Sequence, residues 1–324
     1  MLARSAQGLY WMGRYLERAE HLCRLLRLQI ESLVDRPVEE INHGWTRIYA
    51  GLGRQPPGGD LGTGGSDDYV LADSYTLAGD LTFERSNPDS VRRCLALGRE
   101  NARQMRNCIS AEMWTCLNLC WLRIRDLGIE DIWRVSPESF YAETIREIGT
   151  FTGVADATMY RDEGWRFMRI GRFIERAQLL ASFLLAQLAG REQGGTSDTG
   201  WTSMLRACLA FDAYKSSYSV EVQEDRVLDL LVTDPLLPGS LCRSLDMLAA
   251  ELAAMAPGPG AHDGAAAERL SGRLCALIRY DWPDCEDGDE REALLAQVGE
   301  HCRKLHDLVN AAYIDYAIED SPVH

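Results

Sequence analysis

The sequence lacks long hydrophobic runs, a surplus of positive charge and the alternating patterns of β-strands. Without a stretch of about 18 apolar residues, no membrane-spanning helix is expected. The N-terminus has neither the basic nor the apolar region of a signal peptide, which predicts a cytoplasmic protein. The formal net charge of -15 argues against nucleic acid, because phosphates attract clustered basic side chains. Neither a membrane nor a nucleic acid is therefore expected as a partner.

Motifs for metals and phosphates are also missing. None of the ten cysteines forms a C-x-x-C pair, so they fit a reducing compartment better than a disulfide framework. The glycine-rich segment 51–68 has no lysine of the kind a phosphate-binding loop requires. A single Glu-x-x-His motif, Glu40 to His43, falls short of a di-iron helical bundle. We expect no metal site and no cofactor bound by this chain.

Helical periodicity dominates what is present. Apolar residues recur at spacings of three and four, and three Gly/Pro-rich stretches at 51–68, 190–200 and 257–264 predict surface loops. We therefore predict an all-α protein. The predicted helices cover residues 8–35, 38–51, 88–127, 136–148, 161–190, 201–220, 239–255, 264–280 and 290–318.

One seven-residue segment occurs twice. Residues 13–19 read Gly-Arg-Tyr-Leu-Glu-Arg-Ala, and residues 171–177 read Gly-Arg-Phe-Ile-Glu-Arg-Ala. In each copy an apolar seam runs along one side of the helix, while the Arg and Glu positions lie on the other side. Trp11 and Tyr15 share that charged side in the first copy, as Phe173 does in the second. Each helix is therefore predicted to pack on two faces, with its charges partly buried and paired.

Three interpretations of the Arg-Glu-Arg clusters remain open. A solvated face would hold ion pairs that contribute only about 0.3 kcal/mol each. A buried network would fix the register between helices more than it would strengthen the fold. A binding site would use the arginines to hold an anion, since guanidinium groups bind carboxylate and phosphate bidentately.

Other matches indicate an internal duplication. Trp45-Thr46 precedes a helical stretch, as Trp201-Thr202 does, and the segment 88–95 has an echo in the segment 238–245. We predict two tandem-repeated helical units, residues 1–155 and 156–324, packed as one globular domain. A pseudo-two-fold arrangement of the two units would bring the two clusters together.

The segment 99–106 is the most charged of the structured segments. Arg103 and Arg106 share a face there, close to Glu100 and Asn101, and Glu112 follows in the next turns. This strip could complete the Arg-Glu-Arg network or bind an anion itself. No catalytic residue is assigned. The candidate residues for the network or an anion site are Arg14, Glu17, Arg18, Glu100, Asn101, Arg103, Arg106, Glu112, Arg172, Glu175 and Arg176.

Taken together, these motifs resemble the alpha-E family, bacterial all-helical proteins named for a recurring Glu-Arg motif. The resemblance covers nearly the whole chain, although the loop at 51–68 looks expanded and Gly98 stands where alanine is expected. The matching segments are 9–20, 87–91, 99–103, 109–114, 165–167, 171–177 and 238–240.

The resemblance implies a setting in amide-bond chemistry. Alpha-E proteins typically accompany, or are fused to, circularly permuted ATP-grasp proteins, and transglutaminase-like and proteasome-like peptidases often lie nearby. ATP-grasp enzymes form amide bonds through acyl phosphates, so ATP and Mg belong to the partner ligase. The expected function is an accessory or co-catalytic partner in peptide or amide biosynthesis. An enzyme that carries its own transfer or ligation half-reaction, and a purely structural scaffold, are the alternatives.

Overall fold

The computed structural model describes residues 2–59, 67–190, 198–218, 221–255 and 261–314. All regular elements within these ranges are helices, which confirms the predicted all-α class. The elements are α1 (Ala3–Asp35), α2 (Val38–Gly51), α3 (Asp67–Phe83), α4 (Val91–Gln104), α5 (Ala111–Ile124), α6 (Ile129–Trp133), α7 (Pro137–Thr158), α8 (Glu163–Ala189), α9 (Asp198–Ala207), α10 (Phe211–Ser217), α11 (Glu224–Thr233), α12 (Leu241–Ala253), α13 (Ala261–Ala276), η1 (Leu277–Asp281), η2 (Trp282–Asp284), α14 (Gly288–Val309) and η3 (Asn310–Ile314).

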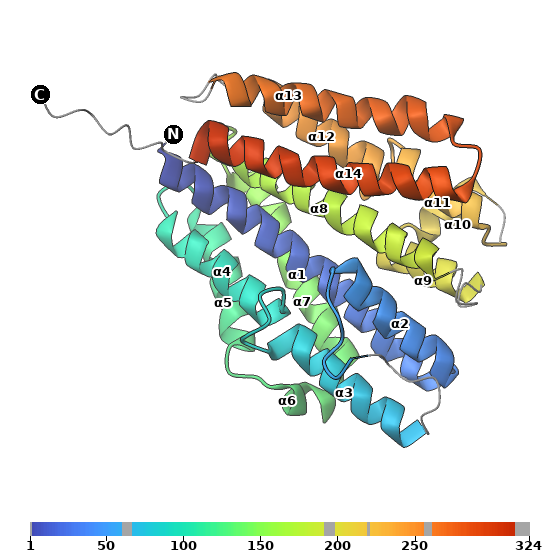
Figure 1. The fold of residues 1–324 in the computed structure, drawn as a ribbon. Coiled ribbons are helices and arrows are strands. Elements are labelled where there is room, and N and C mark those ends of the chain that lie inside the picture. The colour runs from blue at the N-terminus through green and yellow to red at the C-terminus, as the bar shows by residue number, and fades with distance from the viewer. Residues whose placement is uncertain (1, 60–66, 191–197, 219–220, 256–260, 315–324) are drawn as a thin grey trace, which may run out of the picture.

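Two long helices, α1 and α8, form the centre of the molecule (Figure 1). They pack against each other more extensively than any other pair. Helices α4 and α7 cover α1 from one side, whereas α12 and α14 cover α8 from the other (Figure 1). Both Arg-Glu-Arg segments therefore lie on the central helices, at the middle of the bundle.

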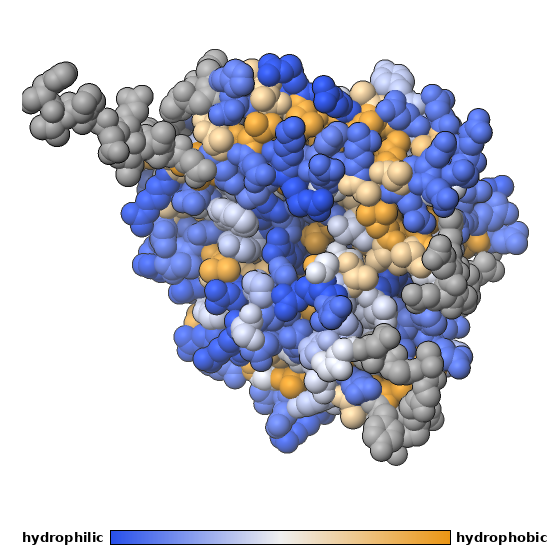
Figure 2. Space-filling view, in the orientation of Figure 1, coloured by the Kyte–Doolittle hydropathy of each residue, from blue (hydrophilic) through white to orange (hydrophobic). Residues whose placement is uncertain are grey.

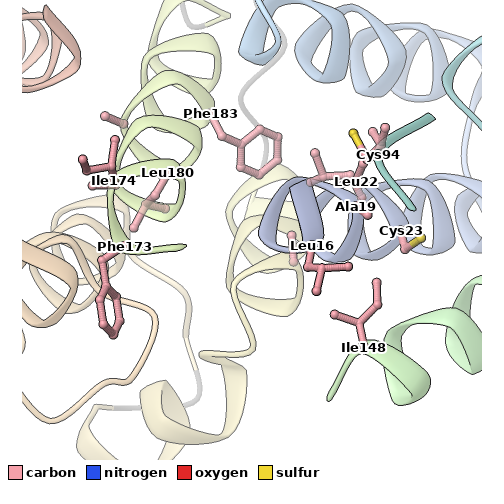
Figure 3. Packing of buried hydrophobic residues seen from close by; sticks show 14 of the residues in the cluster. Leu16, Ala19, Leu22, Cys23, Cys94, Ile148, Phe173, Ile174, Leu180 and Phe183 are labelled. Carbon is pink, nitrogen blue, oxygen red and sulfur yellow. The ribbon is translucent and has the colours of Figure 1, made fainter. Parts of the chain in front are cut away.

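The central helices are buried on more than one side, as their residue pattern predicts. On α1, Leu16 lies toward Ile148 of α7, and Phe183 projects from α8 toward α1 (Figure 3). Burial of such side chains contributes roughly 1.5–3 kcal/mol each. The face of the molecule seen in Figure 2 is mostly hydrophilic, with small hydrophobic groups scattered over it.

Helix boundaries differ from the predictions where caps or backbone geometry intervene. The helix predicted over 88–127 is interrupted, because the Ser110 side chain accepts a hydrogen bond from the Met113 N–H (3.1 Å) and begins α5. The helix predicted over 201–220 is likewise divided, and Leu209 between its two parts has a φ of 55°. Helices α3, α6 and α11 were not predicted; α3 does not segregate its apolar side chains on one face.

Several predictions about loops and domain boundaries are not tested by the described residues. Parts of the three predicted loops, at 60–66, 191–197 and 256–260, fall outside the described residues. The boundary predicted between 155 and 156 falls in the last turn of α7, and the division into two repeated units stays a prediction. None of the described helices is long and apolar enough to cross a membrane.

Candidate functional site

Two glycines let the central helices approach closely. A Cβ atom placed on Gly13 would lie 2.1 Å from the carbonyl oxygen of Met168, and one on Gly171 would lie 2.1 Å from that of Tyr10. Neither backbone oxygen can move aside cheaply, so only glycine is compatible with this crossing. The Arg and Glu side chains that follow each glycine therefore face the opposite helix.

Glu175 is the centre of the first cluster. Its carboxylate accepts hydrogen bonds from the Nε atoms of Arg14 and Arg18, both at 2.6 Å. The Arg14 guanidinium is enclosed further: Nη2 donates to Oε1 of Gln178 (2.6 Å) and Nη1 to the hydroxyl of Tyr10 (3.3 Å). With all three nitrogen atoms of Arg14 engaged, this ion pair is a closed structural unit.

Glu17 is the centre of the second cluster, and its contacts are reciprocal to those of Glu175. It accepts from Nε of Arg172 (2.8 Å) and from Nε and Nη2 of Arg176 (2.6 and 2.8 Å). Both carboxylates are buried, at 2% exposed for Glu17 and 1% for Glu175. The alternative of a solvated face therefore does not hold for them.

Both carboxylates are ionised at neutral pH. Burial by itself would raise the pKa of Glu17, but the charges of Arg176 and Arg172 outweigh it and the pKa is lowered. The same balance, with Arg14 and Arg18, lowers the pKa of Glu175. These groups are consequently unsuited to proton transfer near pH 7, because a general acid or base works best with a pKa near the operating pH.

The two ends of the crossing meet different loops. At the Glu175 end, Nη1 of Arg18 donates to Oδ1 of Asp89, which directly precedes α4 and its N-cap Ser90. The other Asp89 oxygen lies 3.6 Å from Nη1 of Arg54. At the Glu17 end, Nη1 of Arg176 donates to a backbone carbonyl, that of Pro238, at 3.2 Å.

A cavity of about 280 Å³ opens beside the Glu17 end. Arg172, Arg176 and Arg24 line it together with Glu17 and Glu20, a balance of three positive against two negative side chains. The remaining residues around this cavity, which we call the Glu17 cavity, are His21, Leu179, Leu180, Cys208, Leu209, Leu237, Pro238 and Gly239.

One arginine that lines the Glu17 cavity has a nitrogen atom without a partner in the described part of the chain. Nη1 of Arg24 donates to Glu20 (2.8 Å), but Nε of Arg24 is buried and has no hydrogen-bond partner among the described residues. An unpaired buried donor costs roughly 1–3 kcal/mol. His21 supplies no charge, because burial lowers its pKa to about 3. The side chains that line the Glu17 cavity therefore carry one surplus positive charge.

A second cavity, of about 220 Å³, lies between α1, α2, α8 and α9. Arg47 lines it and donates to Gln187, and burial lowers the pKa of Arg47 to about 10. Its Nε also lacks a partner within the described ranges. This cavity is separate from the Arg-Glu-Arg clusters.

The predicted charged strip is located away from the two clusters. Glu100 and Arg103 pair with each other (2.6 Å) at the surface, and the Arg106 guanidinium stacks on the ring of Trp114 at 5.2 Å. Glu112 is exposed in the first turn of α5, and Asn101 accepts the backbone bond that ends α4. Of the predicted residues, the structure thus brings together Arg14, Glu17, Arg18, Arg172, Glu175 and Arg176.

Sequence reasoning missed the side chains that distinguish the two ends. Asp89 and Gly239 stand at matching positions of the two echoed segments. This difference in sequence could have indicated that only one of the two ends has a carboxylate in its loop. Arg24 gave no signal, because one arginine on a helix with many charges is not distinctive. Only its place in the Glu17 cavity identifies it.

The described residues contain no group of three or more His, Cys, Asp or Glu side chains that could hold a metal ion. What these arrangements can do chemically is bind an anion. The Glu17 cavity has the guanidinium donors for it, next to a carboxylate that keeps two of the arginines in place.

Comparison of the sequence with known proteins identifies a family. The model of the Alpha-E family, described as a predicted alpha-helical domain with a conserved ER motif, matches residues 1–314. Uncharacterised proteins of Mycobacterium bovis and of two strains of Mycobacterium tuberculosis are each 27% identical over 317 residues. That match covers 94% of this chain and 35% of each relative, so the chain spans about a third of the relatives' length. No solved structure matches the chain.

Proposed function

This chain belongs to the alpha-E family, and we propose that it is an accessory partner of an ATP-grasp amide or peptide ligase. In this proposal the ligase supplies ATP, Mg and the acyl-phosphate chemistry. The helical chain binds the ligase and presents an anionic substrate through the arginines of the Glu17 cavity. A cytoplasmic location and a transglutaminase-like peptidase in the same system belong to the same proposal.

The length of the relatives supports a partnership. Each mycobacterial relative extends well beyond the matched segment, so the alpha-E portion is joined there to other polypeptide. The family resemblance implies an ATP-grasp protein as the neighbour or fusion partner. A helical unit that acts together with another protein fits both the length of the relatives and this implication.

The ionisation states favour an accessory role over an independent enzyme. Glu17 and Glu175 are each held by two arginines, and their pKa values are lowered. His21 in the Glu17 cavity is neutral, and burial raises the pKa of the Cys208 thiol to about 12. These groups provide neither a base nor a thiolate near pH 7. Binding and positioning remain the chemistry that this site supports best.

The single observation that carries the proposal is the surplus of positive charge in the Glu17 cavity. A purely structural network would be expected to balance its own charges, since an uncompensated buried charge is destabilising. Here three lining arginines face two lining glutamates.

The test is reconstitution with the ATP-grasp protein that accompanies the chain. We expect co-purification, and faster ATP-dependent amide formation by the ligase when the chain is present. Arg24→Gln should lower that stimulation at least tenfold by raising the KM for the acid substrate. Arg103→Gln is the matched control, because Arg103 lies at the surface away from the cavity.

Two results would contradict this proposal. One is the lack of a complex at micromolar concentrations. The other is full stimulation per folded molecule by the Arg24→Gln variant, which would favour the purely structural scaffold.

A further inference from the structure

We propose that the Glu17 cavity binds the carboxylate group of a small acid, at the position where the other end of the helix crossing uses the side chain of Asp89. The inference rests on the proposed function only for the source of that acid. The binding itself belongs to this chain and can be measured without the ligase.

Arg18 and Arg176 use the same atoms for equivalent contacts. Nε of Arg18 donates to Oε1 of Glu175, and Nε of Arg176 donates to Oε1 of Glu17, both at 2.6 Å. The contacts of Nη1 differ, since Nη1 of Arg18 donates to the carboxylate of Asp89 whereas Nη1 of Arg176 donates to the carbonyl oxygen of Pro238. Among the described residues, Arg18 thus hydrogen-bonds two carboxylates and Arg176 hydrogen-bonds one.

The loops that carry these contacts are built alike. Ser90 is the N-cap of α4, and its hydroxyl donates to the carbonyl oxygen of Glu84 at 2.8 Å. Ser240 is the N-cap of α12, and its hydroxyl donates to the carbonyl oxygen of Asp234 at 2.5 Å. In both loops the hydroxyl reaches the carbonyl six residues earlier in the chain. The residue before the cap differs, because it is aspartate at 89 and glycine at 239.

Glycine at 239 leaves room for a ligand. A Cβ atom built there would have the carbonyl oxygen of Cys208 as its nearest neighbour, at 3.4 Å, which is ordinary contact. Gly239 and Pro238 both line the Glu17 cavity. The space next to Arg176 is therefore open where the other loop places a carboxylate of its own.

At each end of the helix crossing, a second arginine lies near the first. Asp89 lies between Arg18 and Arg54. In the Glu17 cavity, Arg24 accompanies Arg176. Among the described residues, Arg24 donates only through Nη1, to Glu20, and a guanidinium group can bind a carboxylate through two of its N–H groups.

Size and charge indicate the class of ligand. The cavity of about 280 Å³ is smaller than the roughly 300–1,000 Å³ of sites for drug-sized molecules. One surplus positive charge matches one bound carboxylate. A phosphate dianion would bring both of its charges to the same place, whereas the second carboxylate of a dicarboxylic acid can stay in solvent. Leu237 and Leu209 at the cavity offer apolar contact for a short hydrocarbon chain, and the positive φ of Leu209 holds this wall in an uncommon conformation. A small organic acid, or an acidic side chain of a peptide, fits these features.

The experiment measures binding of butyrate, glutarate, butyramide and inorganic phosphate by thermal shift and calorimetry on the isolated chain. We expect butyrate or glutarate to bind at millimolar concentration with one site per chain, and butyramide not to bind. Gly239→Asp should abolish that binding and leave the chain folded, because its own carboxylate then fills the site. Gly239→Ala, which adds a methyl group without charge, is the matched control and should retain binding.

Two further variants test the inference even if the Gly239→Asp variant does not fold. Arg24→Gln should weaken acid binding at least tenfold, whereas Arg47→Gln, in the second cavity, should leave it unchanged. The inference is overturned if neither acid binds, if phosphate binds as well as the acids, or if Arg47→Gln removes the binding instead. Acid binding that Gly239→Asp abolishes, with no effect of the chain on the ligase, would support this inference and refute the proposed function.

Discussion

The two ends of the helix crossing make the same ion pairs and meet different surroundings. At one end, Glu175 and its arginines are closed off by Gln178 and Asp89. At the other, Glu17 and its arginines face a cavity of about 280 Å³ and a loop with glycine at 239. The comparison teaches that the shared ion pairs organise the crossing, whereas the neighbouring loops decide whether an end is closed or open.

The largest expected effect is loss of a central carboxylate. Glu175→Gln should lower the free energy of unfolding by about 4 kcal/mol, because it leaves Arg14 buried without its counter-charge. Glu17→Gln should cost less, about 3 kcal/mol, since the side chains of Arg172 and Arg176 are 27% and 17% exposed. Urea-induced unfolding measures both values. Equal losses, or a larger loss for Glu17→Gln, would contradict the distinction between a closed and an open end.

The close approach of the helices is the next feature to break. Gly13→Ala and Gly171→Ala should each lower the free energy of unfolding by about 3 kcal/mol, because the added methyl group would overlap a backbone carbonyl. Gly149→Ala and Gly153→Ala in α7 are matched controls, since a Cβ atom there meets no atom of another described element within 4 Å.

These controls should instead raise the free energy of unfolding by about 0.5–1 kcal/mol, because alanine has the higher helix propensity. Thermal and denaturant unfolding of the four variants measures the contrast. A crossing that tolerated alanine at both Gly13 and Gly171 would mean that the helices lie farther apart.

A smaller effect is a pH dependence that comes from the open end. His21 has a pKa of about 3 in the folded chain and about 6.5 when unfolded. The unfolded state binds the proton first, so stability is lost as pH falls below about 6.5, by about 2 kcal/mol at pH 4.5. The lowered pKa of Glu17 and of Glu175 adds a further loss only below about pH 4.5.

His21→Gln should flatten the unfolding free energy between pH 6.5 and 4.5. His262→Gln should not, because the side chain of His262 is 91% exposed. Urea unfolding at half-unit pH intervals distinguishes the two variants. An unchanged slope in His21→Gln would show that His21 is not held neutral beside the Glu17 cavity.

Much of the fold could be predicted from periodicity, but not every boundary. The central helices were recognised because their apolar residues recur over many turns, as from Leu9 to Ile30. The break before Ser110 was missed, since a serine N-cap inside a helical pattern is a weak local signal beside the surrounding apolar residues. Helix α3 was missed because its apolar residues form no single stripe.

The candidate site was predicted in part. The Arg-Glu-Arg repetition identified the six residues that pair across the helices, because repeated charges on two-faced helices must find partners when buried. The strip around Arg103 looked equivalent in sequence, yet Glu100 and Arg103 pair at the surface. Sequence spacing does not reveal which face of a helix is covered.

The sequence by itself determined that this protein is helical, that two glycine-led charged segments lie on its longest helices, and that it is an alpha-E protein. Only the tertiary structure decided which arginine pairs with which glutamate, and that Arg24 and Gly239 meet at a cavity. The physical reason is that periodicity and propensity act within a few turns. Burial, ion pairing across helices and the space beside a glycine depend on segments more than 150 residues apart.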